Sequence, residues 1–218
     1  YFDFQVILYP NGEIDFNYRS MTGDTDSATI GIQNTNGNAG INISINQNFV
    51  EDMMALNMGI IRTADICDEH EKEVQVCEIE FKDYAKRHYF HGQVVTFSTF
   101  EDNKSVRDVL GKGGVGKVLV VDGRGSRRRA LCGGNIAREA YEKGWEGIVC
   151  NGCIRDQHEI LDLDFGVKAI GASPMRPRKD GIAKLSVQLF FGGVVINHGD
   201  YLYADQDGIV IATKKLHK

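Results

Sequence analysis

The segment from Gly133 to Asp156, GGNIAREAYEKGWEGIVCNGCIRD, constrains the fold of this chain more than any other stretch. A short helix is predicted from four apolar residues spaced so that they share one face: Ile136, Ala137, Ala140 and Tyr141. Gly144 then provides a C-terminal stop. Residues 147–150 form a short apolar run before Asn-Gly, which is typical of a buried strand. A glycine turn followed by a helix and a strand predicts an α/β unit.

The same segment combines two features that suit an anionic ligand. The helix start near Gly134 offers backbone N–H groups without intrahelical acceptors and the positive end of the helix dipole. Arg155 and Asp156 follow the strand, at the end where α/β proteins usually bind ligands. We therefore expect a site between the helix start and the Arg155–Asp156 pair.

Composition sets limits on the class of protein. The chain has 218 residues, of which 42% are hydrophobic, enough for a sizeable core. A formal net charge of −5 argues against a general nucleic-acid binder. No apolar run approaches the ~20 residues that cross a bilayer. Tyr1 lies inside an expected strand, so we expect a fragment or a processed chain.

Cysteine usage favours a reducing, cytoplasmic location. The five cysteines are odd in number and irregularly spaced: Cys67, Cys77, Cys132, Cys150 and Cys153. We interpret Cys150 and Cys153 as small residues beside a strand end. A zinc site would need a second ligand pair, and a redox CxxC would open a helix.

Residues 1–62 differ from the rest of the chain in residue pattern. They are expected to form a separate β-hairpin-rich segment, either a fragment or a fusion. Apolar and polar residues alternate around Pro10-Asn11-Gly12, a strong hairpin signal. The segment loosely resembles strand-rich modules of secreted bacterial proteins. Asp24 and Asp26 are interpreted as a solvated turn, with a calcium loop as the alternative. Residues 51–62 are expected to be a helical connector.

Residues 63–218 form the second predicted domain. Its expected strands are 93–97, 117–121, 167–172, 185–190, 194–197 and 208–212, and its expected helices are 105–110 and 158–163. Many strands with few short helices predict a layered β/β/α domain of the α/β class. Asp205 and Asp207 are expected to cap the turn before the last strand. Asp122 is expected to be a turn or interface residue, with metal binding as the alternative. Arg127-Arg128-Arg129 is expected to be a turn with one arginine directed at a carboxylate.

Residues 64–218 resemble the RraA-like family, named for regulator of ribonuclease E activity A, which also contains the 4-hydroxy-4-methyl-2-oxoglutarate aldolases. The resemblance rests on five stretches: FEDN (100–103), KVLVVDGRGSRRRAL (117–131), NIAREAYEKGWEGIVCNGCIRD (135–156), FGG (191–193) and GDYLYADQDGIVI (199–211). It implies a swivelling β/β/α fold and a homotrimer, sometimes stacked into a hexamer.

In the aldolase branch the resemblance also implies roles for particular residues. Arg155 would hold the carboxylate of a pyruvyl group, and Asp156 would bind a divalent cation, Mg²⁺ or alternatively Mn²⁺. The helix start at Gly134, with the N–H groups of Asn135 and Ile136, would complete the substrate site. A guanidinium binds a carboxylate through two parallel charged hydrogen bonds, and a hard cation prefers carboxylate and water oxygens.

One position departs from the aldolase pattern. The pattern has an acidic residue twenty-one positions before the arginine, where it organises the water that handles the proton. Gly134 stands there in this chain. We expect Gly134→Asp to raise the aldolase rate, since general acid–base help is worth ~10²–10⁴-fold.

Three hypotheses follow from these observations. The first is a metal-dependent (class II) lyase that cleaves 4-hydroxy-4-methyl-2-oxoglutarate-type substrates or decarboxylates oxaloacetate. The second is a non-catalytic regulator that binds and inhibits a ribonuclease E-type endonuclease. The third is a structural fusion whose N-terminal segment mediates adhesion.

Overall fold

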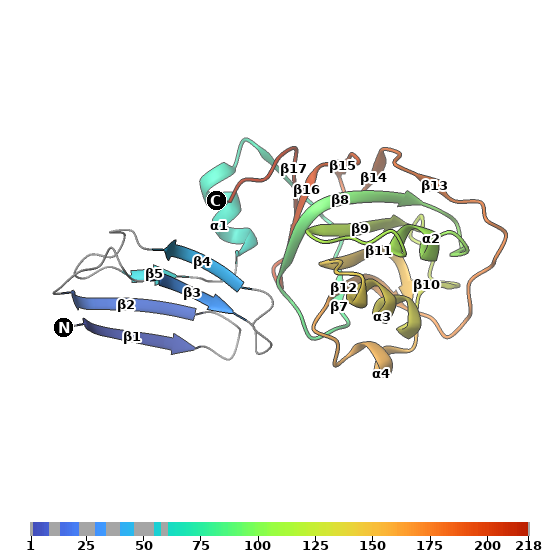
Figure 1. The fold of residues 1–218 in the computed structure, drawn as a ribbon. Helices are drawn as coiled ribbons and strands as arrows, with labels where there is room; N and C mark the ends of the chain where they lie inside the picture. The colour runs from blue at the N-terminus through green and yellow to red at the C-terminus, as the bar shows by residue number, and fades with distance from the viewer. Residues whose placement is uncertain are drawn as a thin grey trace. The chain divides into compact units, whose positions relative to one another are not determined.

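The computed structural model describes residues 61–217 in full and, before them, the backbones of five strands. The chain divides into two compact units, residues 1–60 and 61–218, which are considered separately (Figure 1). The strands of the first unit are β1 Phe2–Leu8, β2 Ile14–Met21, β3 Thr29–Gln33, β4 Gly40–Ile45 and β5 Ala55–Asn57. β1 pairs antiparallel with β2, and β3 pairs antiparallel with β4, as the alternating pattern predicted.

Of the other expectations for the first unit, those for the two turns lie outside the described residues and that for a helical connector is wrong. Pro10-Asn11-Gly12, Asp24 and Asp26 lie outside the described residues. The helical connector expected at 51–62 is wrong where it is described, because β5 pairs antiparallel with residues 15–17 of β2. A short apolar run does not distinguish a helix from a strand without its partner.

The second unit is built on one mixed sheet. Its strand order is β6-β17-β16-β8-β9-β11-β12-β7, with β10 beside β11 and β13 beside β8. The elements, in chain order, are α1 Thr63–His70, β6 Val74–Val76, β7 Lys82–Asp83, β8 Phe90–Ser98, α2 Val106–Leu110, β9 Lys117–Asp122, β10 Ala130–Cys132, α3 Gly134–Glu142, β11 Gly147–Ile154, α4 Gln157–Ile160, β12 Gly166–Ala172, β13 Lys184–Leu185, β14 Leu189–Phe191, β15 Val194–Ile196, β16 Tyr201–Ala204 and β17 Ile209–Ala212.

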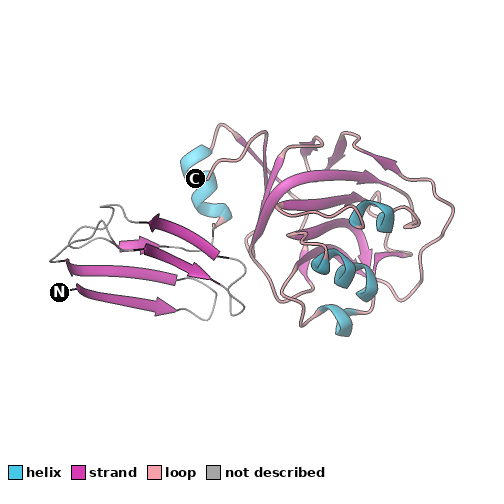
Figure 2. Cartoon of the chain, viewed as in Figure 1, coloured by secondary structure: helices cyan, strands magenta, loops and turns pink. Residues whose placement is uncertain are grey.

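The centre of the sheet is parallel and covered on both faces. β8, β9, β11 and β12 run parallel, and every residue of β11 is buried. On one face, Leu119 and Ile148 pack in a cluster with residues of α2, α3 and α4. On the other face, Val118 and Val149 pack with the β14–β15 hairpin. Figure 2 shows the three helices grouped together in cyan. The predicted α/β class with β/β/α layering is confirmed, since strands buried on both faces need a layer on each side.

Several elements differ from the sequence expectation. β11 continues through Asn151-Gly152 to Ile154 instead of turning after Cys150. Gly152 fits here because a Cβ would lie 3.0 Å from Cδ1 of Leu131. The expected strand 185–190 is divided into β13 and β14, with Ser186 between them at φ 52°. The helix expected over 158–163 is only the single turn α4.

Asp205 and Asp207 lie in the turn between β16 and β17 as predicted, whereas Asp122 is the last residue of β9 and caps the turn that follows. Oδ1 of Asp122 accepts the N–H of Arg124 at 2.8 Å, and Oδ1 of Asp205 accepts that of Asp207 at 2.9 Å. Asp205 also accepts the hydroxyl of Thr63 at 2.7 Å, which attaches α1 to the last hairpin. In the parts of the chain that the structure describes, no helix combines the length and apolar character needed to cross a membrane.

Candidate ligand-binding site

The Arg155–Asp156 pair and the start of α3 meet because two parallel strands end side by side. β10 pairs parallel with β11, and β10 leads through Gly133 into α3. β11 leads directly into Arg155 and Asp156, and the N–H of Arg155 donates to the carbonyl of Cys132 at 2.9 Å. The site therefore lies at the carboxyl ends of parallel strands, where α/β folds place ligands.

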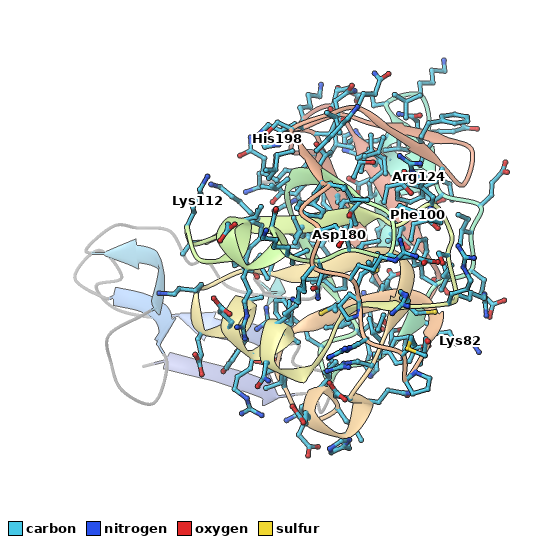
Figure 3. All side chains as sticks on the ribbon, turned by 90° about the vertical axis from the view of Figure 1, so that its right-hand side faces the viewer. Lys82, Phe100, Lys112, Arg124, Asp180 and His198 are labelled. Atoms are coloured by element: carbon cyan, nitrogen blue, oxygen red, sulfur yellow. The ribbon has the colours of Figure 1, made fainter. Side chains whose placement is uncertain are left out.

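A cavity of about 590 Å³ opens at this position. Its walls include Gly133, Asn135 and Ile136 from the start of α3, together with Arg155 and Asp156. The lining also includes the loop 176–180, whose Asp180 is labelled in Figure 3. The structure thus brings the predicted site residues to one cavity, apart from Gly134, which is buried beside it.

Arg155 and Asp156 contact each other within the cavity. Nε of Arg155 lies 3.1 Å from Oδ2 of Asp156, and each side chain is 37% exposed. Asp156 has the left-handed backbone conformation, φ 55° and ψ 45°, which is uncommon for a residue with a side chain. A Cβ on Gly133 would lie 2.9 Å from Oδ2 of Asp156 and 3.3 Å from Cγ of Arg155, so glycine lets the pair approach the backbone.

The available amides at the start of α3 differ by one residue from the expectation. The N–H of Ile136 donates to the carbonyl of Gly133 at 3.0 Å, as does that of Ala137. Gly134 and Asn135 precede these first helical bonds, and the first N–H groups of a helix have no intrahelical acceptor. The amides without an intrahelical acceptor at the start of α3 are therefore those of Gly134 and Asn135, whereas that of Ile136 is already used.

Glu159 is a neighbour of the site that sequence reasoning missed. A Cβ on Gly134 would overlap Oε2 of Glu159 and would lie 2.6 Å from the Cβ of Glu159. The carboxylate of Glu159 therefore occupies the space that a side chain at position 134 would take. The glycine at position 134 and the acidic residue three positions after Asp156 are visible in the sequence, but nothing in the sequence indicates that they lie together.

The cavity is strongly basic. Its lining contains six basic side chains and two carboxylates, Asp156 and Asp180. The basic residues are Arg107, Arg129, Arg155, Arg176, Arg178 and Lys179. Such a lining attracts anions with more than one negative charge.

The segment FEDN (100–103) holds the loop 176–180 that lines the cavity. Oδ2 of Asp102 accepts the N–H groups of Asp180 and Gly181, the latter at 3.0 Å. The N–H of Arg178 donates to the carbonyl of Glu101 at 2.7 Å. These bonds fix the basic loop in the wall of the cavity that the start of α3 also lines.

All three arginines of the run 127–129 make polar contacts within the protein, whereas only one was expected to contact a carboxylate. Two of its arginines contact the buried carboxylate of Glu101: Nε of Arg128 lies 2.6 Å from Oε1, and Nε of Arg129 lies 3.7 Å from Oε2. Hydrogen bonds from the Ser126 hydroxyl and from Arg128 hold the pKa of Glu101 below its ordinary value. Arg127 donates to the carbonyl of Ile170 at 2.8 Å.

The cysteines near the site are free and buried. Cys150 and Cys153 lie within β11, and Cys132 ends β10 in the cavity wall. Burial raises the pKa of Cys132 to about 12. This thiol stays protonated at neutral pH and is a poor nucleophile.

Comparisons with known proteins agree on the family and differ on the activity. A model of the family described as RraA-like, Aldolase/RraA, matches residues 63–211. A protein from Alkalilimnicola ehrlichii, provisionally named 4-hydroxy-4-methyl-2-oxoglutarate aldolase, is 46% identical over 156 residues, which cover 72% of this chain and 97% of the relative.

Two solved structures share the fold of the second unit. One is described as an S-adenosylmethionine:2-dimethylmenaquinone methyltransferase from Geobacillus kaustophilus HTA426. It is 47% identical with a TM-score of 0.71, and the match covers 72% of this chain and 97% of that chain. The other is described as the RNA-processing inhibitor RraA from Thermus thermophilis. It is 40% identical with a TM-score of 0.70, over 72% of this chain and 95% of that one. These descriptions name different activities for proteins that share one fold. The activity of this chain therefore has to be inferred from the residues of its cavity and not from the fold.

Proposed function

The chain belongs to the RraA-like family, Aldolase/RraA, and from this premise we propose that it is a divalent-cation-dependent lyase acting on small 2-oxo acids. The proposed reactions are cleavage of 4-hydroxy-4-methyl-2-oxoglutarate-type substrates and decarboxylation of oxaloacetate, each of which releases pyruvate. The observation that carries the proposal is that Arg155 and Asp156 lie in one cavity with the start of α3.

Arg155 is proposed to bind the carboxylate of the pyruvyl group. A guanidinium can donate two parallel charged hydrogen bonds to a carboxylate, which fixes its orientation as well as its position. The amides of Gly134 and Asn135, at the positive end of α3, add donors for the oxygens of the same group. The remaining basic side chains suit the second carboxylate that both proposed substrates carry.

The donor chemistry of the cavity fits a hard cation, with Asp156 as its ligand. The carboxylate of Asp156 is partly exposed, and the described residues contain no group of three or more His, Cys, Asp or Glu that could hold a metal. A single carboxylate completed by water is the type of site that suits Mg²⁺, with Mn²⁺ as the alternative. When bound, the cation would polarise the 2-oxo group as a Lewis acid.

A pyruvate-release assay tests the proposal. The full chain is mixed with oxaloacetate and Mg²⁺, with buffer containing Mg²⁺ alone as the background and a chelator as a second arm. We expect release above background that the chelator abolishes. Arg155→Lys should raise KM, because an ammonium cannot reproduce the bidentate contact. Arg138→Lys, on the exposed side of α3, is the matched control. Release at the background rate would contradict the proposed function.

A second candidate is a non-catalytic regulator that binds a ribonuclease E-type endonuclease. Gly134 favours it, since the acid of the aldolase pattern is missing there, and a 40% identical structure is described as an RNA-processing inhibitor. RNA cleavage by such an endonuclease, with and without this chain, distinguishes the two functions. Inhibition without pyruvate release would favour the regulator.

Assembly and location belong to the same proposal. We propose a homotrimer, or a hexamer formed by two trimers, in the cytoplasm, where the five free cysteines would stay reduced. Light scattering of the full chain measures the assembly. A monomer at micromolar concentration would contradict it.

A further inference from the structure

The carboxylate of Glu159 and the missing side chain of Gly134 form a matched pair. Any side chain at position 134 would overlap Oε2 of Glu159, and its Cβ would lie 2.6 Å from the Cβ of Glu159. The close approach of α4 to α3 therefore depends on glycine at this position. The space is not vacant but already holds an acidic group from another helix.

The local backbone directs Glu159 to this place. The left-handed conformation of Asp156 turns the chain sharply after β11, and α4 begins with the next residue. The N–H of Glu159 donates to the carbonyl of Asp156 at 3.0 Å, which fixes this first turn. Residues three apart lie on one side of a helix. The carboxylate of Asp156 therefore adjoins Gly133, and that of Glu159 adjoins Gly134.

The Glu159 carboxylate adjoins Gly134, next to the cavity residues Gly133 and Asn135. It lies at the first residue of α3, where the helix dipole and the open amides favour negative charge. The side chain is 39% exposed, so water can reach it, and Nε2 of His158 lies 3.8 Å from Oε1. Asp156, by contrast, is paired with Arg155 and is assigned to the cation.

We propose that Glu159 is the residue that positions the proton-carrying water in this cavity, acting from α4 in place of a side chain at position 134. The inference rests on the proposed lyase function. In aldol cleavage the water, held by Glu159, accepts the proton of the 4-hydroxyl group as the C3–C4 bond breaks. The electron pair of that bond passes to the enolate of pyruvate. The proton then returns to C3, which gives pyruvate.

The same position serves decarboxylation. When CO₂ leaves oxaloacetate, the electron pair of the broken bond again forms the enolate of pyruvate, and C3 needs one proton to complete the product. The water beside Glu159 delivers that proton, and the solvent replaces it. A residue that only neutralised the helix start would take no part in this transfer.

Proton exchange on bound pyruvate tests the role. The full chain is incubated with pyruvate and Mg²⁺ in heavy water, and loss of the C3 methyl signal is followed by proton NMR. Pyruvate release from oxaloacetate is measured in parallel. Glu159→Gln should lower both rates by about 10²-fold, in the range of general acid–base effects, while KM changes by less than about threefold.

Three further variants make the test specific. Glu142→Gln changes an exposed acid at the other end of α3 and should leave both rates unchanged. Gly134→Asp combined with Glu159→Gly moves the carboxylate to position 134 and removes the Cβ of residue 159 that would collide with it, so it should recover activity to within about tenfold of wild type, if proton transfer is what was lost. Gly134→Asp alone should lower activity, because its Cβ collides with Glu159. This reverses the expectation, drawn from the sequence, that Gly134→Asp raises the rate.

The outcomes separate this inference from the proposed function. If wild type exchanges no pyruvate protons and releases no pyruvate, both are overturned. If wild type is active and Glu159→Gln is equally active, only the role of Glu159 is overturned. The same holds if Glu159→Gln loses activity only through a raised KM or a lower melting temperature, since that is the signature of a structural contact.

Discussion

Nε of Arg155 lies 3.1 Å from Oδ2 of Asp156, so the two side chains proposed to bind substrate and cation neutralise each other across one peptide bond. Each is 37% exposed, and ion pairs that water reaches contribute only about 0–1 kcal/mol. The pair can therefore open at low cost when ligands arrive. Gly133 makes this arrangement possible, because its missing side chain leaves room for both groups.

Asp156→Asn should separate the two roles. The variant removes the partner of Arg155, so pyruvate binding without Mg²⁺ should become up to about fivefold tighter, the equivalent of about 1 kcal/mol. Stimulation of pyruvate release by Mg²⁺ should be lost, because the cation loses its carboxylate. Calorimetric titration measures the first effect and the release assay the second. Asp162→Asn, at an exposed residue after α4, is the control. Continued stimulation by Mg²⁺ would mean that the cation binds elsewhere.

Gly133→Ala should weaken substrate binding more than it destabilises the fold. The backbone of Gly133, φ −137° and ψ 178°, is one that alanine adopts readily. The new Cβ would lie 2.9 Å from Oδ2 of Asp156, which must shift and displace the pair. We expect a raised KM with a melting temperature within a few degrees of wild type. Gly208→Ala is the matched control, because a Cβ there meets no atom within 4 Å. An unchanged KM would show that the position of the pair does not matter for substrate binding.

The sequence predicted those helices and strands whose spacing of apolar residues indicates which side chains are buried. Residues 117–121 are a buried strand, and Ile136, Ala137 and Ala140 form the buried face of α3. Tyr141 was expected on that face but is 44% exposed, because α3 is short and packs through small residues. The parts stabilised by distant side chains were not predicted. Asp102, for example, holds the N–H of Gly181.

In the candidate site, too, some residues could be predicted from the sequence and others could not. Arg155 and Asp156 could be selected from the sequence because they follow a strand and match a family pattern. Glu159 could not, because its position depends on the left-handed backbone of Asp156 and on the contact between α4 and α3. The sequence pattern indicated a missing acid at Gly134. The structure shows that a different acid fills the same space.

Glu101→Gln should lower the stability of the second unit. The carboxylate of Glu101 is buried and accepts hydrogen bonds from the Ser126 hydroxyl at 2.7 Å and from Nε of Arg128 at 2.6 Å. Both bonds go to Oε1, and the amide oxygen of glutamine can accept them only if its NH₂ group takes the place of Oε2, 3.7 Å from Nε of Arg129. We expect a lower melting temperature near neutral pH, with Glu142→Gln as the exposed control.

The pH dependence of the melting temperature tests whether the charge of the Glu101 carboxylate stabilises the fold. Its pKa is lowered in the folded state, first by the Ser126 hydroxyl and also by Arg128, so the unfolded state binds a proton more readily. The stabilisation is therefore complete above the unfolded pKa, about 4.3, and is lost as the pH falls through the folded pKa. The gap in melting temperature between wild type and Glu101→Gln should narrow under acid conditions. A gap that is constant with pH would mean that the carboxylate charge plays no part.

His217 should make the fold less stable as the pH falls from about 6.5 towards about 4. Nδ1 of His217 lies 3.0 Å from the hydroxyl of Tyr203, and its ring centroid is 4.4 Å from that of His91. Burial, followed by the nearby His91 and Lys215, lowers the pKa of His217 to about 4. Burial also lowers the pKa of His91, so both histidines act in the same direction.

Over this interval the unfolded chain takes up a proton that the folded chain excludes, so acidification favours unfolding. His217→Gln removes one of the two titrating groups, and its melting temperature should fall less than that of wild type between about pH 7 and pH 5. His198→Gln, at an exposed residue, should follow the wild-type curve. If the wild-type and His217→Gln curves run parallel, the histidine cluster does not control acid stability. The slope would then have to come from carboxylates such as Glu101, whose effect sets in at lower pH.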